Sequence, residues 1–484
     1  MSKKINFEYI ILTIIILVGF VIRLYKINNP IADWHSWRQA DTASVSRIYV
    51  EKGINLLYPK YHDISSIQSG IFDPEGFRFV EFPIYNAIHV LLFEAAPSIG
   101  LEIWGRLLTI ASAIVTAVFL YLIGKRFLGA WGGLLSSFFY LFIPYNIYFT
   151  RVILPDPFGT MLGVSSLWFF IRYIDDSKEF NIYLSAILMA LAFLIKPFFG
   201  FYLTPVAYLA INRFGFKNLL KTGGRVRSFL IYGLIIFAPL LLWRYWEGLH
   251  PEGIPFFKWA FNGDGIRFRP AFWHWIFEER LGQLILGGWG LILFVFGIMS
   301  AKAKNYFVNY FLLGILLYVV VVATANVRHD YYQIITIPAI SLSLAAGTVY
   351  LWEGHFFNKI FSRILVIFCV YMMLTTGWSL IKDDYNINHP EIIAAGREVD
   401  RITPKDALVV APYNGDTAFL YQTQRSGWPA IDDSIDNIIA KGASYYVSVD
   451  LGSADTKMIE SRFTTVEKTE KYIIINLREP LNPK

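Results

Sequence analysis

The chain has 484 residues, of which 55% are hydrophobic, 17% aromatic and only 17% charged. Soluble proteins usually carry about 25% charged residues, and several apolar runs here approach the ~20 residues that cross a bilayer, so the composition excludes an ordinary soluble protein. The single cysteine, Cys369, excludes an intrachain disulfide and a cysteine-rich metal finger, and the modest net charge of +6 favours membrane-loop orientation over nucleic-acid binding.

The apolar runs predict a polytopic helical membrane protein. The first run is followed by basic residues instead of a small-residue cleavage site, so we expect it to be retained as a span. Residues 82–97 form a shorter apolar stretch that could cross, re-enter or lie in the interface. About eleven spans are predicted, at 8–26, 102–123, 130–149, 157–174, 181–196, 198–212, 228–246, 281–299, 306–324, 332–351 and 359–379.

Lysines and arginines in short loops predict the orientation of these spans. They place the N-terminus in the cytoplasm and the C-terminus outside, provided that 82–97 does not cross or that an extra crossing lies beside it. The same scheme gathers the unusual polar residues of the other loops on the outer face. The cytoplasmic markers are Lys3, Lys4, Lys125, Arg126, the loop 212–228, Lys302, Lys304, Lys359 and Arg363.

The first outer loop, residues 28–81, begins with the stretch PIADWHSWRQADT directly after the first span. It holds two carboxylates, Asp33 and Asp41, with His35 and Arg38 between them. A carboxylate just outside a span can act as a general base, and the planar donor fork of Arg38 suits phosphate. The alternative is an ordinary wet loop with tryptophan anchors at the interface.

Two further carboxylates stand next to spans. Glu81 precedes an apolar stretch and is either a helix N-terminal acid or a second carboxylate that faces Asp33. Arg151 and Asp156 lie in YFTRVILPDPFGT between two spans. They form either a structural salt bridge or a site at which Asp156 binds a cation or positions a substrate.

Basic and aromatic residues mark three other segments of the predicted outer face. Lys196 lies in the apolar stretch AFLIKPFFGFYL, where a lysine is costly and indicates function, although it could also snorkel. Arg328, His329 and Tyr332 are packed into the short turn ANVRHDYYQ. The loop 247–280 could hold phosphate and stack on a sugar, or form an amphipathic interfacial segment.

From about residue 384 the pattern changes to alternating helices and strands. Helices in HPEIIAAGREVDRIT, DTAFLYQTQR, SIDNIIAKG and KMIESRF alternate with strands in DALVVAP, ASYYVSVD and KYIIINL. This order predicts a small α/β domain with a partly parallel sheet. The segment contains neither a GxGxxG motif nor a P-loop, so we expect no nucleotide cofactor. The fold class is therefore an all-α polytopic membrane domain, residues 1–383, with about 11–13 transmembrane helices, followed by a small extracytoplasmic α/β domain, residues 384–484.

The order of these motifs resembles the GT-C superfamily of membrane glycosyltransferases, and most closely the branch related to aminoarabinose (lipid A) transferases and protein O-mannosyltransferases. The matching stretches are ADWHSWRQADTA, EFPIYN, GRLLTIASAIVTAVFLYLIGKRFLG, IPYNIYFTRVILPDPFGTML, LAFLIKPFFGF and RHDYYQIITIPAISLSLAAG. The resemblance implies that Asp33 is the catalytic residue, as the base or the organiser of the acceptor hydroxyl, and that Glu81 and Asp156 lie near the site and could hold a divalent metal ion. The candidates for substrate or phosphate binding are Arg38, Lys196, His35, Asp41, Arg328, His329 and Tyr332.

The expected function is transfer of a sugar from a polyprenyl-phosphate donor to a hydroxyl of a lipid, glycan or protein acceptor, by inverting single displacement on the outer face of the plasma membrane. Three alternatives stay open at this point. A transporter or flippase would keep its sites near the bilayer midplane. A glycan ligase or polymerase would use a lipid pyrophosphate. A non-enzymatic scaffold for the outer domain would leave the polar clusters unexplained.

Overall fold

The computed structural model describes residues 7–217, 223–300 and 306–481, which divide into two compact units. The helical unit comprises Met1–Ile27, Arg106–Arg244 and Phe257–Asp383. The mixed unit comprises Asn28–Gly105, Tyr245–Phe256 and Asp384–Lys484, so it takes in the first polar loop as well as the predicted C-terminal domain. Lys3, Lys4, Lys302 and Lys304 of the orientation prediction, and Lys221 of the loop 212–228, lie outside the described residues.

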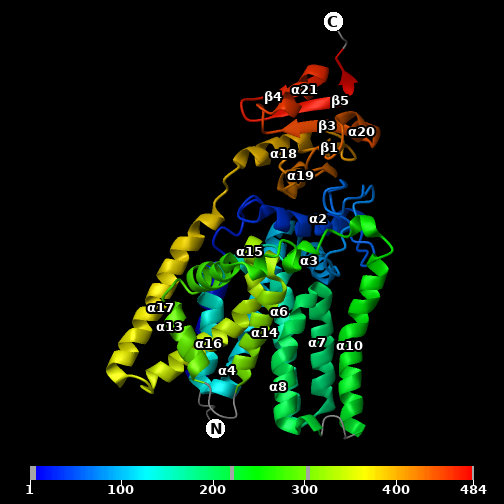
Figure 1. Ribbon diagram of the computed structural model, residues 1–484. Coiled ribbons are helices and arrows are strands. Elements are labelled where there is room, and N and C mark those ends of the chain that lie inside the picture. The colour runs from blue at the N-terminus through cyan, green and yellow to red at the C-terminus, as the bar shows by residue number, and fades with distance from the viewer. Residues whose placement is uncertain (1–6, 218–222, 301–305, 482–484) are drawn as a thin grey trace. The chain divides into compact units, whose positions relative to one another are not determined.

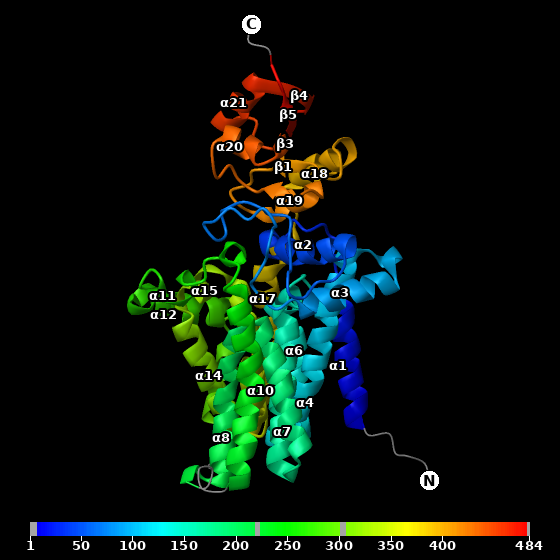
Figure 2. The same ribbon diagram turned by 90° about the vertical axis from the view of Figure 1, so that its right-hand side faces the viewer.

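Long helices form most of the helical unit, and many of them run side by side (Figures 1 and 2). Every predicted span overlaps one of them. The longer helices are α1 (Phe7–Arg23), α4 (Leu101–Phe142), α6 (Asp156–Asp176), α7 (Glu179–Ile195), α8 (Leu203–Phe214), α10 (Gly223–Glu247), α13 (Gly290–Met299), α14 (Phe307–Val321), α16 (Ile337–Trp352) and α17 (Lys359–Ile381). Shorter elements are α5 (Pro144–Phe149), η2 (Pro197–Tyr202), α11 (Trp259–Asn262), η4 (Ile266–Phe268), α12 (Pro270–Trp273), the π-helix η5 (His274–Ile285), α15 (Ala323–Arg328) and η6 (Asp330–Thr336).

Several of these helices are suited to a bilayer. Among the described residues, four segments are long and apolar enough to cross a membrane, and a pair bent by 114° would make a fifth if it forms one span. The number of crossings predicted from the sequence stays a prediction. The four segments are Leu101–Phe142, Gly223–Glu247, Asp330–Trp352 and Lys359–Ile402, and the bent pair is Pro270–Ile285 with Gly290–Met299.

Two features resolve ambiguities in the apolar pattern. Gly129 has φ 82° inside α4, so this helical run bends there, in the gap between two predicted spans.

The stretch 82–97 contains α3 (Ile84–Ala95), a helix of 12 residues. At 1.5 Å per residue α3 rises about 18 Å, which is too short for a hydrocarbon core of about 30 Å.

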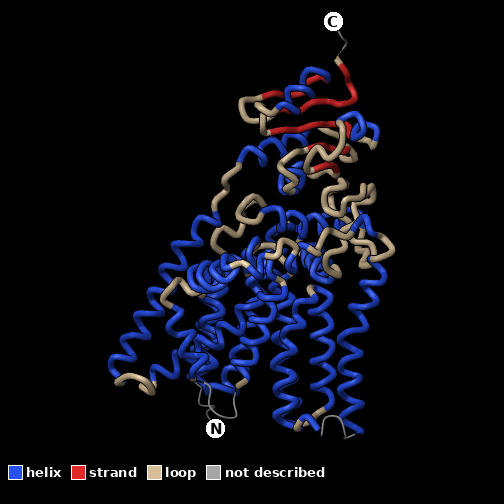
Figure 3. Tube along the Cα trace, viewed as in Figure 1, coloured by secondary structure: helices blue, strands red, loops and turns tan. Residues whose placement is uncertain are grey.

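The mixed unit contains a five-stranded sheet in the order β2-β1-β3-β5-β4 (Figure 3). Strand β1 (Leu408–Val410) pairs in parallel with β2 (Gly427–Trp428) and β3 (Ala443–Ser448), whereas β5 (Ile473–Pro480) pairs antiparallel with β3 and β4 (Phe463–Lys468). The predicted partly parallel α/β domain is thus confirmed, although β2 and β4 were missed. The helices of this unit are α2 (Ser36–Lys52), α3, η1 (Pro97–Ile99), η3 (Pro251–Gly253), η7 (Lys382–Tyr385), α18 (Pro390–Ile402), α19 (Thr417–Thr423), α20 (Ile435–Ala440) and α21 (Ala454–Arg462).

The first polar loop completes one edge of this sheet. The N–H of Ile64 donates to the C=O of Gly427 at 2.9 Å, and the N–H of Gly427 donates to the C=O of His62 at 2.9 Å. A Cβ atom at residue 427 would lie 1.8 Å from the C=O oxygen of Val409, so only glycine allows this close approach. Because an edge strand leaves backbone groups unpaired, this pairing explains why residues far apart in the sequence form one unit.

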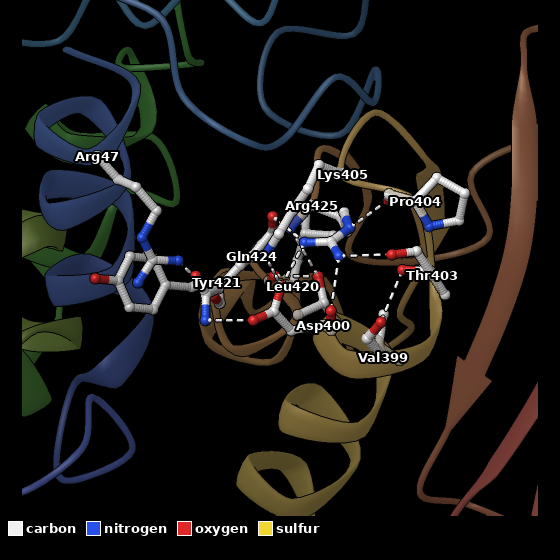
Figure 4. A network of polar contacts seen from close by, with 11 residues as sticks. Arg47, Val399, Asp400, Thr403, Pro404, Lys405, Leu420, Tyr421, Gln424 and Arg425 are labelled. Atoms are coloured by element: carbon white, nitrogen blue, oxygen red, sulfur yellow. Dashed lines mark hydrogen bonds and ion pairs between the residues drawn. The ribbon is translucent and has the colours of Figure 1, made fainter. Parts of the chain in front are cut away.

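A buried arginine, Arg425, joins α18 to the segment that follows α19 (Figure 4). Its Nη1 lies 2.7 Å from Asp400 Oδ1, and its Nη2 donates to the C=O groups of Asp400 at 3.0 Å and Thr403 at 2.9 Å. Its Nε donates to the C=O of Pro404 at 2.7 Å. One side chain therefore satisfies three carbonyls and one carboxylate at the C-terminal end of α18.

We expect Arg425→Met to destabilise the mixed unit by about 1–3 kcal/mol, because the carbonyls of Asp400 and Thr403 lose this donor, whereas the Asp400 carboxylate keeps its contacts with Lys405 and Gln424. The effect is measured by heating the purified full-length chain and recording the temperature at which residues 384–484 become susceptible to a protease. Arg397→Met on the exposed face of α18 is the matched control and should change stability by less than about 0.5 kcal/mol. Equal unfolding temperatures for the two variants would contradict the role of Arg425.

Candidate functional site

The candidate residues fall into two clusters, one in each unit. The first surrounds the start of α2, and the second lies where α6, α7 and the 3₁₀ segment η6 meet. The first cluster comprises Asp33, His35, Arg38, Asp41 and Glu81, and the second comprises Asp156, Lys196, Arg328, His329 and Tyr332.

Asp33 stands immediately before α2 and is buried, with 4% of its surface exposed. His35 has a left-handed backbone (φ 54°), so the chain turns sharply between Asp33 and the helix. Gln39 Nε2 donates to Asp33 Oδ1 at 2.7 Å. This hydrogen bond ties the Asp33 carboxylate to the first turn of α2.

Arg38 and Glu81 form a buried ion pair. Arg38 Nη2 donates to both carboxylate oxygens of Glu81, at 2.9 and 3.0 Å. The two residues are 3% and 8% exposed, respectively. The pair joins α2 to the segment before α3, so a phosphate bound at Arg38 would have to share the guanidinium with Glu81.

Asp41 is held by two partners that come from distant parts of the chain. Its Oδ2 lies 2.5 Å from Arg78 Nη2, and its Oδ1 accepts a hydrogen bond from Thr417 Oγ1 at 2.6 Å. The guanidinium of Arg78 also lies 4.9 Å from the ring of Tyr61. Because both oxygens of this fully buried carboxylate are engaged, the arrangement favours a structural role for Asp41: it anchors α2 to α19.

A second contact between α2 and α19 involves Arg47 (Figure 4). Its guanidinium lies 3.6 Å from the ring centre of Tyr421, and its Nη1 donates to the C=O of Tyr421 at 2.8 Å. Glu102 accepts from Arg47 Nη2 at 3.2 Å and from the hydroxyl of Tyr421 at 2.8 Å. The helix that follows Asp33 is therefore attached to α19 at two positions, Asp41 and Arg47.

Sequence reasoning missed three residues of this cluster, namely Gln39, Arg78 and Thr417. Gln39 stands in the same short stretch as Asp33, and Arg78 is a cation in the apolar stretch GFRFVEF, three residues before Glu81. Both therefore had a local signal. Thr417 had none, because 376 residues separate it from Asp41.

The carboxyl group next to Thr417 is unusually easy to protonate. Burial raises the pKa of Asp416 to about 6, and the negative charge of Asp41 acts in the same direction. The N–H of Ala418 and the charges of His35 and His389 oppose this shift. Between about pH 4 and pH 6 the folded protein holds a proton at Asp416 that the unfolded chain releases, so this group stabilises the fold less as the pH rises.

We expect Asp416→Asn to remove this pH dependence. The unfolding temperature of the variant minus that of the unchanged protein should therefore increase between about pH 4 and pH 6.5. Burial also lowers the pKa of His62, and this shift makes the fold more stable as the pH rises. Because it affects both proteins equally, it cancels when their unfolding temperatures are subtracted. A difference that does not change with pH would contradict the assignment.

In the helical unit, Asp156 and Lys196 form a buried ion pair. Asp156 is the first residue of α6, and Lys196 follows the last residue of α7. Lys196 Nζ contacts Asp156 Oδ1, and the residues are 7% and 0% exposed, respectively. Asp156 Oδ2 is buried without a hydrogen-bond partner among the described residues. Lys196 also lies over two aromatic rings, 4.5 Å from Tyr332 and 5.1 Å from Tyr331.

The segment after α15 places these two rings over the lysine. The C=O of Asp330 accepts from the hydroxyl of Tyr145 at 2.7 Å, and the C=O of Tyr332 accepts from the hydroxyl of Tyr318 at 3.0 Å. These bonds fix the 3₁₀ turn of η6. The structure thus brings Lys196, Asp156 and Tyr332 together, as three residues selected from separate motifs.

The other two candidates of this segment have different neighbours. Arg328 is 58% exposed and lies 3.4 Å from Asp264 Oδ2. The His329 ring lies 5.5 Å from the Trp259 ring and 6.3 Å from the Tyr332 ring. His329 therefore borders the lysine cluster through Tyr332, whereas Arg328 pairs with a carboxylate of the loop 247–280.

The two carboxylates that could hold a divalent metal are each paired with a cation, Glu81 with Arg38 and Asp156 with Lys196. The described part of the chain contains no group of three or more His, Cys, Asp or Glu that could bind a metal ion. A metal site needs several ligands, so the binding of a divalent metal ion at Glu81 or Asp156 stays a prediction.

The lysine cluster and a basic cavity lie at opposite ends of the helical unit. Arg126, Asp175 and Arg213 line a cavity of about 490 Å³ at the far end of α6 from Asp156. At 1.5 Å per residue, Asp156 and Asp175 are about 28 Å apart along this helix, which is close to the thickness of a hydrocarbon core. The predicted cytoplasmic cations and the predicted outer cluster are thus separated by about one bilayer thickness.

Residues 98–243 match the family model described as dolichyl-phosphate-mannose-protein mannosyltransferase. Among solved structures, the chain is similar to ArnT from Cupriavidus metallidurans bound to undecaprenyl phosphate, with a TM-score of 0.64 and 12% identity over 96% of this chain and 97% of that chain. It is also similar to the Archaeoglobus fulgidus oligosaccharyltransferase in complex with Zn and sulfate (TM-score 0.57, 11% identity, 91% of this chain and 68% of that chain). A third similar structure is the arabinofuranosyltransferase AftD from Mycobacteria (TM-score 0.54, 14% identity, 96% of this chain and 41% of that chain). Comparison with curated protein sequences gives no match.

These similarities confirm the predicted fold class, a GT-C fold with a small C-terminal sheet domain. At 11–14% identity, the similarity to solved structures establishes only the fold. The family model adds a match within the sequence that covers α4 to α10. Together, the shared fold and this match indicate a membrane glycosyltransferase.

Proposed function

We propose that the chain transfers a sugar from a polyprenyl-phosphate donor to a hydroxyl group of a lipid, glycan or protein acceptor, on the outer face of the plasma membrane. The observation that carries this proposal is the buried lysine of the helical unit, Lys196, with Asp156 and Tyr332 around it. Burying a lysine is costly in free energy, and a buried lysine next to an apolar span therefore indicates a functional role for its charge. Undecaprenyl phosphate, the lipid bound to ArnT, is a ligand with the complementary charge.

The donor needs little acid catalysis, because a phosphate ester of a sugar already carries a good leaving group. Its departure requires cations that stabilise the growing negative charge on the phosphate. Lys196 supplies one such cation, and its flexible stem can move the ammonium between Asp156 and a phosphate oxygen. In this proposal, Asp156 holds the lysine in place until the donor binds, and the rings of Tyr331 and Tyr332 lie beside its ammonium.

The acceptor hydroxyl needs a base, and Asp33 is the residue assigned to this role. The acceptor oxygen attacks the anomeric carbon from the face opposite the phosphate, while its proton passes to the Asp33 carboxylate. The new glycosidic bond forms as the bond between the anomeric carbon and the phosphate oxygen breaks. The products are the glycosylated acceptor with inverted configuration and polyprenyl phosphate, whose charge Lys196 balances.

A transporter or flippase is less well supported by the position of the charges. A transport site would lie near the middle of broken spans, whereas Asp156 is the first residue of α6 and Lys196 follows the last residue of α7. A ligase that uses a lipid pyrophosphate has a specific observation in its favour, the similarity to an oligosaccharyltransferase. It would need the same base and the same cation, so the two enzymes differ in the donor.

The experiment that tests the proposal uses the purified full-length chain with radiolabelled polyprenyl-phosphate sugars and polyprenyl-pyrophosphate glycans, each offered with candidate lipid, glycan and peptide acceptors. We expect label to move to an acceptor hydroxyl only from the monophosphate donor, with inverted configuration. Transfer from the pyrophosphate donor would favour the ligase. In reconstituted vesicles, movement of intact donor across the membrane without transfer would overturn the enzyme assignment in favour of a flippase.

A further inference from the structure

A cavity of about 340 Å³ lies in the mixed unit, away from the Asp33 cluster. Its walls are the C-terminal half of α2, the loop that follows α2, and Phe77. Lys52 lies about 21 Å along α2 from Arg38, at 1.5 Å per residue. The volume is at the lower end of the range for small-ligand pockets, and the cavity forms a separate place on the molecule.

Aromatic side chains give the cavity a rigid wall. The Tyr58 ring lies 5.8 Å from the Phe77 ring and 5.4 Å from the Trp246 ring, and these contacts hold it in one orientation. The hydroxyl of Tyr49 donates to the C=O of Asn55 at 2.6 Å and closes the loop after α2. A preformed wall of this kind costs little conformational entropy when a ligand binds.

The charge of the cavity favours an anion. Its lining, drawn from the described residues, contains two lysines, Lys52 and Lys60, and no acid. Lys60 contacts the exposed carboxylate of Glu75 and lies 5.3 Å from the ring centre of Phe77. An exposed pair such as Lys60 with Glu75 is worth little, so an anionic ligand could replace the carboxylate. Lys52 is exposed in the last turn of α2.

The loop beside the cavity has the character of a membrane interface. The C=O of Leu57 accepts a hydrogen bond from Trp246 Nε1 at 2.9 Å, and Trp246 lies in the last turn of α10, a helix long and apolar enough to span a bilayer. Ile54, Leu56 and Leu57 are apolar and exposed, at 39%, 37% and 47%. Tryptophan at a span end and exposed aliphatic side chains are typical of the headgroup region.

We propose that this cavity binds the anionic, phosphate-bearing headgroup of a membrane lipid. Lys52 and Lys60 neutralise the phosphate, Tyr58 and Phe77 contact the rest of the headgroup, and the loop around Leu57 contacts the acyl chains. The proposal concerns binding alone, so it stands or fails independently of sugar transfer.

The test measures equilibrium binding of radiolabelled phosphatidylglycerol to the full-length chain in detergent, with phosphatidylcholine of the same acyl chains as the neutral lipid. The double variant Lys52→Gln/Lys60→Gln should weaken phosphatidylglycerol binding about thirtyfold, since a lysine near a membrane surface is worth about fivefold. Tyr58→Leu should also weaken it. The matched control is Lys457→Gln/Lys471→Gln, two exposed lysines of the C-terminal domain, which should leave binding unchanged.

Three results would overturn the proposal. Equal loss in the control variant would mean that the lipid follows net charge and has no defined site. Displacement of the label by inorganic phosphate as readily as by unlabelled phosphatidylglycerol would assign the cavity to a free phosphate. Unchanged binding in the lysine variant, with an unfolding temperature equal to that of the unchanged protein, would exclude the cavity as the lipid site.

Discussion

Asp33→Asn is expected to lower the rate of sugar transfer about 10²- to 10⁴-fold, the range that a general base contributes. Asparagine has the same shape and can still accept the hydrogen bond from Gln39, which lies 2.7 Å from Asp33 Oδ1. It cannot take up the proton of the acceptor hydroxyl. The loss should therefore appear in kcat, with the KM for the donor and the unfolding temperature nearly unchanged, and initial rates with purified full-length protein measure it.

Two further variants make this test specific. Asp41→Asn removes a carboxylate from the same stretch, but its oxygens are occupied by Arg78 and Thr417, so we expect a lower unfolding temperature along with any loss of rate. Asp406→Asn, at an exposed position of the C-terminal domain, is the neutral control. If Asp33→Asn keeps full activity, and Asp41→Asn loses activity without losing stability, the base is Asp41.

Much of the architecture could be predicted because it follows from local pattern. Hydropathy located a helix at each predicted span, and the glycine at position 129 coincides with the predicted gap between two of them. Alternating turn, strand and helix signals located α18 to α21 and three of the five strands. These features depend on neighbouring residues, which a single sequence contains in full.

Strand β4 was missed although it pairs with its neighbour β5, whereas two other missed features depend on contacts between distant residues. Strand β2 has two residues and is defined by its neighbours Val409 and Val410 on β1, and the segment around Asp63 joins it from the other side. Neither has a periodic signal of its own. The sequence predicted a domain boundary at residue 383, and the structure groups residues 28–105 with the C-terminal domain. This grouping depends on contacts between distant residues, which composition does not reveal.

For the candidate site, the residue types could be predicted better than their partners. Lys196 and Asp156 were selected as charges next to apolar spans, and the structure pairs them with each other. Arg38 and Glu81 were selected separately and also form a pair. Charge next to an apolar run thus indicates burial, whereas the choice between a phosphate, a metal ion and a neighbouring side chain as partner depends on three-dimensional packing.

The second large effect is expected at Lys196. Lys196→Met leaves Asp156 as a buried carboxylate without its cation, which should cost about 3–5 kcal/mol of stability. It should also abolish donor binding, because the ammonium that balances the lipid phosphate is lost. The unfolding temperature of the detergent-purified protein measures the first effect, and binding of radiolabelled polyprenyl phosphate measures the second.

The double variant Lys196→Met/Asp156→Asn separates these two effects. It removes both charges of the pair, so no uncompensated carboxylate remains, and most of the lost stability should return. Donor binding should not return, because a phosphate needs the cation whether or not Asp156 is charged. If the double variant binds polyprenyl phosphate as tightly as the unchanged protein, the pair serves only to join α6 to the end of α7, and the phosphate must be held by another cation. If binding stays lost while stability recovers, the positive charge of Lys196 serves donor binding and the fold does not require it, because the neutral pair packs equally well.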